Sequence, residues 1–186
     1  MPNTLTAGRS AARDVTTSAL LAALLTASAI VAIPVGAVPF TLQTLVLVLI
    51  AITQRPARAA LTVLAYLLVG LVGLPVFSGL RGGLGVLLGP TGGYLIGFWA
   101  GAVLGAVVRE RLVAAGRSRL MTDAVAAAVV IVVVYAFGWL QLQLVTSMGA
   151  VPALLAGVVP FVIPDALKAA AAIALAPLVR KASGQV

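Results

Sequence analysis

The chain has 186 residues, of which 62% are hydrophobic and 9% are charged, and its mean hydropathy is +1.21. This composition is too apolar for a water-soluble domain and indicates an integral membrane protein. The sequence contains no cysteine and no histidine, which excludes thiolate nucleophiles, imidazole bases and the commonest transition-metal sites. Most enzyme mechanisms are lost with these residues, and our interpretation of the chain includes no catalytic residue, no metal and no cofactor. We interpret the net charge of +8 as membrane orientation rather than nucleic-acid binding.

Six apolar segments follow one another along the chain. Their approximate bounds are Val15–Ile33, Thr41–Thr53, Ala59–Gly73, Gly92–Val108, Asp123–Leu144 and Pro152–Leu178. Such runs are typical of helices that cross a hydrocarbon layer of roughly 30 Å. They predict an all-α integral membrane protein in which residues 1–186 form a single transmembrane domain, a six-transmembrane-helix bundle with cytoplasmic tails at 1–14 and 181–186. The first run is longer than a signal peptide's apolar region, so we expect a retained helix.

The positive charges are distributed unequally between the joints of these segments. Ten of the twelve lie at the termini and in the second and fourth joints, namely Arg9, Arg13, Arg55, Arg58, Arg109, Arg111, Arg117, Arg119, Arg180 and Lys181. The opposite side carries only Arg81. By the positive-inside rule the ten-charge side is cytoplasmic, which predicts a multi-pass protein of the cell membrane with both termini inside the cell.

Two segments have features that are typical of a transporter's binding site. The second, at about 20 Å, is too short to cross alone, and the preceding PVGAVPF contains two prolines and a glycine. The last segment is interrupted by Pro160 and Pro164. Irregular backbone at membrane depth is tolerated only where protein or a water-filled cavity covers it, so we expect a site on the outer side.

The stretch from Gly73 to Tyr94, here called the glycine stretch, forms the outer loop between the third and fourth predicted helices. Eight of its 22 residues are glycine, and most of the others are apolar. A solvated linker would be rich in serine and charge, so we expect a packed lid. The nucleotide-binding patterns GxGxxG and GxxxxGK[ST] do not occur, so any ATP hydrolysis must take place on another subunit.

Asp165 is the acidic residue most indicative of function. We expect Asp14, Glu110 and Asp123 to be solvated at segment ends, whereas Asp165 lies inside the last segment, one helical turn before Lys168. Ionisable residues in membrane helices usually face the protein interior and mark a substrate or ion path. The alternative is a self-neutralising pair, or a Lys168 that extends to the interface while Asp165 accepts bonds from first-turn amides.

Small residues recur every four positions in two segments. Gly93, Gly97, Gly101 and Gly105 do so in the fourth segment, and Ala19, Ala23 and Ala27 in the first. Such spacing lets helices approach closely in lipid. We expect the glycines to pack internally, while the alanines remain open between internal packing and a docking face for another membrane subunit.

Four motifs together resemble the BioY family, the membrane-embedded biotin-capturing S component of energy-coupling-factor (ECF) transporters. They are VPFTLQT (38–44), GLPVFSG (73–79), GGLGVLLGPTGGY (82–94) and DALK (165–168). The resemblance implies a six-helix bundle that binds biotin from the outer side. It also implies a separate transmembrane coupling protein and a pair of cytoplasmic ATPases as partners. The alanines of the first helix resemble the surface that family members use for docking.

The resemblance and the chemistry of biotin together suggest a binding site. Its expected residues are Phe40, Thr41, Gln43, Phe77, Ser78, Gly79, Arg81, Gly82, Gly83, Tyr94, Asp165 and Lys168. Asp165 could accept the urea N–H bonds, Gln43 or glycine-stretch amides could donate to the urea carbonyl, and either Lys168 or Arg81 could neutralise the carboxylate. The aromatic side chains, with Trp139 as a further candidate, could enclose the rings.

Two rival functions remain open from the sequence. The first is an S component or small transporter for a different anionic metabolite. The second is an intramembrane hydrolase with Ser78 as nucleophile and Lys168 as base, because such a dyad needs no histidine. No local nucleophile motif surrounds Ser78, so we predict that the chain is not an enzyme. We also expect Asp165→Asn to reduce biotin binding sharply without unfolding the protein.

Overall fold

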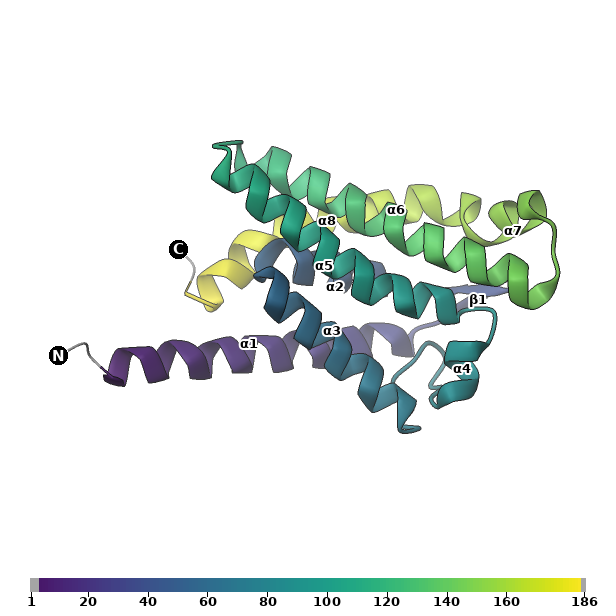
Figure 1. The fold of residues 1–186 in the computed structure, drawn as a ribbon, viewed down its shortest axis with the longest axis horizontal. Helices are drawn as coiled ribbons and strands as arrows, with labels where there is room; N and C mark the ends of the chain where they lie inside the picture. The colour runs from purple at the N-terminus through teal and green to yellow at the C-terminus, as the bar shows by residue number, and fades with distance from the viewer. Residues whose placement is uncertain (1–3, 185–186) are drawn as a thin grey trace.

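The computed structural model describes residues 4–184, with side chains from Arg13 onward except that of Val35. The helices, drawn in Figure 1, are α1 Thr4–Ile30, α2 Gln43–Thr53, α3 Pro56–Leu71, α4 Leu84–Leu88, α5 Gly92–Ala114, α6 Arg119–Thr146, α7 Ala150–Gly157 and α8 Val162–Ala182, with a 3-10 turn, η1, at Val159–Phe161. Two strands, β1 Ile33–Val35 and β2 Val38–Phe40, follow α1. The predicted tail positions 1–3 and 185–186 lie outside the described residues, and α1 begins at Thr4, within the predicted N-terminal tail.

Each predicted apolar segment is helical over most of its length. Within the described chain, three stretches are long and apolar enough to cross a membrane: Gly92–Ala114, Arg119–Thr146 and Ala150–Ala182. The last stretch is broken at η1, which contains Pro160. Pro164 does not interrupt it, contrary to our prediction, because it lies in the first turn of α8, where a missing N–H costs no helical bond.

The short helix α2 is the centre of the bundle. All of its residues except Leu45 are buried, and it packs against α1, α5, α6 and α8. A helix that is apolar on every side is buried on every side. Its shortness is made up by the preceding PVGAVPF, which forms the antiparallel hairpin of β1 and β2. Gly36, with φ +65°, makes the tight turn. Pro34 pairs with Pro39, so the two residues that lack a backbone N–H lie opposite each other in the hairpin.

The two ends of the bundle differ in character (Figure 1). The β1–β2 hairpin, α4 and α7 lie at one end, here called the hairpin end. The start of α1, the end of α8 and the α5–α6 turn lie at the other, here called the terminal end. The hairpin, the glycine stretch around α4 and the joint around α7 therefore converge on one end.

Helices α5 and α6 pack closely through the glycines of α5. Gly93, Gly97, Gly101 and Gly105 are all buried. A β-carbon added at Gly101 would lie 3.0 Å from the carbonyl oxygen of Val130 in α6, and one at Gly97 would lie 2.9 Å from the Cα of Val134. Contacts this short leave no room for a side chain. The prediction that the glycines pack internally is confirmed.

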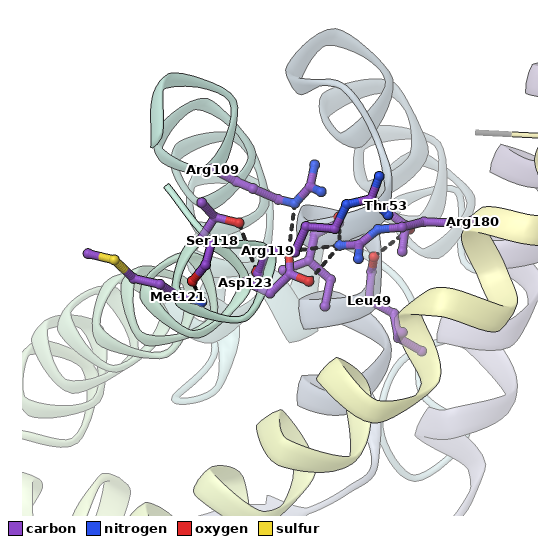
Figure 2. A network of polar contacts seen from close by, with 10 residues as sticks. Leu49, Thr53, Arg109, Ser118, Arg119, Met121, Asp123 and Arg180 are labelled. Carbon is purple, nitrogen blue, oxygen red and sulfur yellow. Dashed lines mark hydrogen bonds and ion pairs between the residues drawn. The ribbon is translucent and has the colours of Figure 1, made fainter. Parts of the chain in front are cut away.

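The terminal end is held together by a buried charge cluster, here called the terminal charge cluster and shown in Figure 2. Asp123 of α6, only 3% exposed, accepts bonds of 2.7 Å from Arg109 of α5 and Arg180 of α8. Arg180 also donates to the carbonyl oxygen of Ile52 in α2 at 2.8 Å. Our expectation that Asp123 is solvated at a segment end is therefore wrong, because two guanidinium groups replace its water.

Candidate functional site

A cavity at the hairpin end collects most of the predicted site residues. Its walls come from β2, the start of α2, the glycine stretch, α5, α6, η1 and α8. Eight of the twelve predicted residues line it: Thr41, Gln43, Phe77, Ser78, Arg81, Tyr94, Asp165 and Lys168. Phe40, Gly79, Gly82 and Gly83 do not line it. We call this space the ligand cavity.

Asp165 and Lys168 form a buried ion pair in the wall of the ligand cavity. Both lie in the first turns of α8, and they are 4% and 7% exposed. Lys168 Nζ donates to Asp165 Oδ1 at 2.8 Å, and the hydroxyl of Tyr135 in α6 donates to Oδ2 at 2.8 Å. The predicted self-neutralising pair therefore exists, but it faces the cavity rather than lipid. Carboxylate oxygens can accept further bonds, so Asp165 can still receive donors from a ligand.

Phe40 contacts the lysine rather than the cavity. The Lys168 ammonium lies 3.8 Å from the centroid of the Phe40 ring. An ammonium over an aromatic face is attracted by the ring quadrupole. Phe40 therefore helps to hold Lys168 beside Asp165, a contact that connects β2 to α8.

Gln43 is held in one orientation by two neighbours. Its Nε2 donates to the hydroxyl of Tyr66 in α3 at 2.8 Å, and its Oε1 accepts a bond from Thr41 Oγ1 at 3.2 Å. The Tyr66 hydroxyl in turn donates to the carbonyl oxygen of Val76 at 3.2 Å. An amide nitrogen has two donors, so Gln43 keeps one N–H for a ligand in the cavity.

Within the glycine stretch, residues 77–81 form a tight loop at the cavity. Phe77 and Arg81 pair across it as an isolated antiparallel bridge. Phe77 is buried with its ring edge-on to Tyr66 and directly over Gly70, where any side chain would overlap the ring. Arg81 is exposed, and its Nε donates to the carbonyl oxygen of Ser78 at 3.0 Å. The loop therefore places a guanidinium at the cavity mouth.

The hydroxyl of Ser78 is buried and has no hydrogen-bond partner among the described residues. Buried polar atoms are nearly always paired, and an exception needs an explanation. Lys168, the base of the hypothetical hydrolase dyad, is paired with Asp165 instead. The structure does not form the Ser78–Lys168 dyad. The unpaired hydroxyl of Ser78 in the cavity wall is instead available to hydrogen-bond a ligand.

The rest of the glycine stretch contains α4 and packs on the surface of the bundle. Helix α4 has no buried residue. Its end is held to α6 by Gln141, whose Nε2 donates to the carbonyl oxygens of Leu87 and Gly89 at 2.7 and 2.8 Å. Val86 and Leu87 are half-buried against the core, and Val86 also lines the cavity, so this part of the stretch packs over the cavity, as expected of a lid.

Several cavity residues were not predicted from the sequence. They include Thr44, Thr91, Leu95, Phe98, Tyr135 and Phe161. Tyr135 has the clearest role, because it bonds to Asp165. The sequence does contain an indication of this role: Tyr135 lies in the middle of an apolar run, where a buried hydroxyl needs a hydrogen-bond partner. Trp139, a candidate to enclose a ring, instead donates to the carbonyl oxygen of Ala150 and does not line the cavity.

The alanines of α1 are exposed. Ala19, Ala23 and Ala27 lie on the surface, and Ala19 borders a groove between α1 and α3. Of the two possibilities left open, internal packing is therefore not found within the described chain.

Comparisons with known proteins show the family to which the chain belongs. The model of the BioY family matches residues 1–185. A probable biotin transporter BioY of Pyrococcus horikoshii is 34% identical over 89% of this chain and 94% of its own length, and the biotin transporter BioY of Rhizobium etli is 38% identical over 86% and 89%. The crystal structure of the S-component for biotin from an ECF-type ABC transporter matches with a TM-score of 0.85 at 25% identity, over 91% of this chain and 92% of the other. The chain belongs to the BioY family.

Proposed function

We propose that this protein is the substrate-capture S component of an ECF-type transporter and that it binds biotin in the ligand cavity. The observation that carries the proposal is the buried Asp165–Lys168 pair, which faces the cavity in a chain of this family. Family members are transporter S components rather than enzymes, so we do not pursue the hydrolase alternative. No cofactor is needed, because biotin is the cargo.

The cavity offers a partner for each polar group of biotin. Asp165 accepts the N–H bonds of the urea, and the free N–H of Gln43 donates to the urea carbonyl. Arg81 and the unpaired hydroxyl of Ser78 receive the carboxylate. We assign the carboxylate to Arg81 rather than Lys168, because Lys168 is already neutralised by Asp165 whereas Arg81 has no ion pair among the described residues. Phe77 and Tyr94 enclose the rings.

The glycine stretch covers part of the ligand cavity, so we propose that it moves when biotin enters. Phe77, Ser78, Arg81 and Val86 of this stretch line the cavity. Helix α4 is attached by the Gln141 bonds, by a backbone bond from Gly83 to Gly70 and by Val86 and Leu87 against the core, and we propose that it swings outward to admit the ligand and closes over it again. Closure of a segment around a ligand is a common switching mode.

We place the hairpin end outside the cell and the terminal end in the cytoplasm of a multi-pass cell-membrane protein. The ten basic residues at the terminal end support this orientation. We count six crossings, formed by α1, α2 with its hairpin, α3, α5, α6 and the α7–α8 unit, all within a single domain. The lipid bilayer then surrounds the exposed apolar side chains of the outer helices.

The energy for uptake comes from other subunits. We propose that a transmembrane coupling protein docks on the exposed face of Ala19, Ala23 and Ala27, and that a pair of cytoplasmic ATPases drives inward release. Small residues allow a partner helix to approach closely in lipid. Nucleic acid has no part in this function.

Calorimetric titration of the detergent-purified protein with biotin tests the proposal. We expect saturable one-to-one binding, and a rise in melting temperature with biotin concentration, because a ligand that binds only the folded state stabilises it. A panel of other anionic vitamins serves as the control. Stabilisation by one of them and not by biotin would assign the cavity to the alternative metabolite.

Tyr135→Phe should weaken biotin binding about tenfold, because Asp165 loses a charge-assisted hydrogen bond that orients its carboxylate. Tyr94→Phe is the matched control, since it keeps the ring and removes a hydroxyl that, among the described residues, bonds to the carbonyl oxygen of Gly157 and not to Asp165. Titration calorimetry on both variants measures the difference. Equal affinity losses in the two would show that Tyr135 acts on stability and not through Asp165.

A further inference from the structure

A second cavity opens at the terminal end, far from the ligand cavity. It has a volume of about 810 Å³ and is bordered by the start of α1, the α2–α3 joint, α5 and the end of α8. Four arginines line it: Arg13, Arg55, Arg58 and Arg109. We call it the arginine cavity. The BioY function proposed above does not use it.

The arginine cavity carries an excess of positive charge. Its lining includes two acidic residues, Asp14 and Glu110, against the four arginines. Asp14 pairs with Arg58, and Arg109 bonds to Asp123, whose charge Arg180 already offsets. Among the described residues neither Arg13 nor Arg55 has an ion-pair partner, and both are exposed. The cavity can therefore accept an anion.

The arginine cavity continues into an apolar groove. The α1–α3 groove shares Asp14 and Arg58 with it and then runs along Val15, Ala22, Leu61 and Ala65. Val15 and Leu61 are 69% and 64% exposed. A basic cavity joined to an exposed apolar groove is complementary to an anionic amphiphile: the cavity suits its charged headgroup, and the groove suits its apolar chain.

We propose that an anionic phospholipid binds here, with its phosphate in the arginine cavity and an acyl chain in the α1–α3 groove. Basic residues near the cytoplasmic face attract anionic headgroups, and basic pockets between membrane helices bind them. A lipid fits better than an acidic protein segment, because the groove lies on the outer surface of two membrane helices. The placement of the headgroup in the inner leaflet rests on the proposed orientation.

The lipid site overlaps the docking face. Ala19 lines the α1–α3 groove and is also the first residue of the exposed alanine face. A bound acyl chain therefore covers part of the surface on which a partner helix would pack. The lipid must leave this position when the coupling protein docks.

The double variant Arg13→Gln/Arg55→Gln tests the headgroup contact. Native mass spectrometry of the full chain should show that the wild-type protein retains phosphatidylglycerol in preference to phosphatidylcholine, and that this preference falls about tenfold or more in the variant. Arg111→Gln/Arg117→Gln removes the same charge from exposed positions outside the cavity and should keep the preference. Equal losses in the two variants would overturn the proposal, as would wild-type retention of phosphatidylcholine equal to that of phosphatidylglycerol.

A second variant tests the acyl-chain contact independently. Ala65→Phe fills the α1–α3 groove and leaves every arginine in place, so phosphatidylglycerol retention should fall while biotin titration is unchanged. Retention at the wild-type level in Ala65→Phe would contradict the proposal. Displacement of the lipid by soluble glycerophosphate at equal concentration would assign the cavity to free phosphate. Variants that keep lipid but lose assembly with the coupling protein would assign it to an acidic protein segment.

Discussion

Asp165→Asn should weaken biotin binding by about a hundredfold or more. An amide in place of the carboxylate loses the charge-assisted bonds to the urea N–H groups, and a hydrogen bond to a charged group contributes about 1.5–3 kcal/mol. The measurement is titration calorimetry of the purified variant. Wild-type affinity in this variant would remove Asp165 from the site.

The Asp165→Asn variant should also lose stability, because Asp165 belongs to a buried ion pair. Lys168 is 7% exposed and loses its partner in Asp165→Asn. Breaking a buried pair by removing one member is strongly destabilising, whereas replacing both members with neutral groups is often neutral. The structure therefore predicts a loss of melting temperature in the single variant, which our sequence-based expectation did not include.

The double variant Asp165→Asn/Lys168→Met separates binding from stability. It leaves no unpaired charge, so its melting temperature should return toward that of the wild type while biotin binding remains lost. Recovery of biotin affinity together with stability would show that the pair only supports the fold.

Asp123→Asn should destabilise the protein more than any other single change of an acidic residue at the terminal end. Arg180, 4% exposed, would keep its charge without a carboxylate, and its Nε already has no partner among the described residues. Removing one member of a buried pair costs about 3–5 kcal/mol. Thermal unfolding in detergent measures the loss. Biotin affinity below the melting transition should be unchanged, because the ligand cavity is at the hairpin end.

Asp14→Asn is the matched control at the same end. It removes the same charge from the Asp14–Arg58 pair, whose side chains are 24% and 35% exposed. Pairs with this exposure contribute about 0–1 kcal/mol. If the two variants melt at the same temperature, the terminal charge cluster contributes no more than a surface ion pair.

The sequence predicted those parts of the fold that depend on neighbouring residues. Apolar run length and proline position located the helices, and the i, i+3 spacing of Asp165 and Lys168 placed the two charges on one face of a helix. The break at Pro160 was found in the same way. These features need no knowledge of which helices are neighbours.

The features that were missed depend on contacts between distant segments. Asp123 looked like a solvated end residue, because its partner Arg180 is 57 positions away. Tyr135 is 30 positions from Asp165, so its hydroxyl could not be assigned to the site. PVGAVPF was expected to be irregular because its prolines lack N–H donors, but the in-register pairing of Pro34 with Pro39 allows a hairpin.

The burial of α2 has a consequence for biosynthesis. Its 11 residues extend about 16 Å, roughly half the hydrocarbon thickness. Helix α2 is therefore too short to be inserted into lipid by the translocon as an independent span. Three of the helices that surround it, α5, α6 and α8, are synthesised later. Gln43 on α2 and Asp165 on α8 therefore meet only when synthesis is nearly complete, and a nascent chain that stops before α8 has half a binding site and an unprotected central helix.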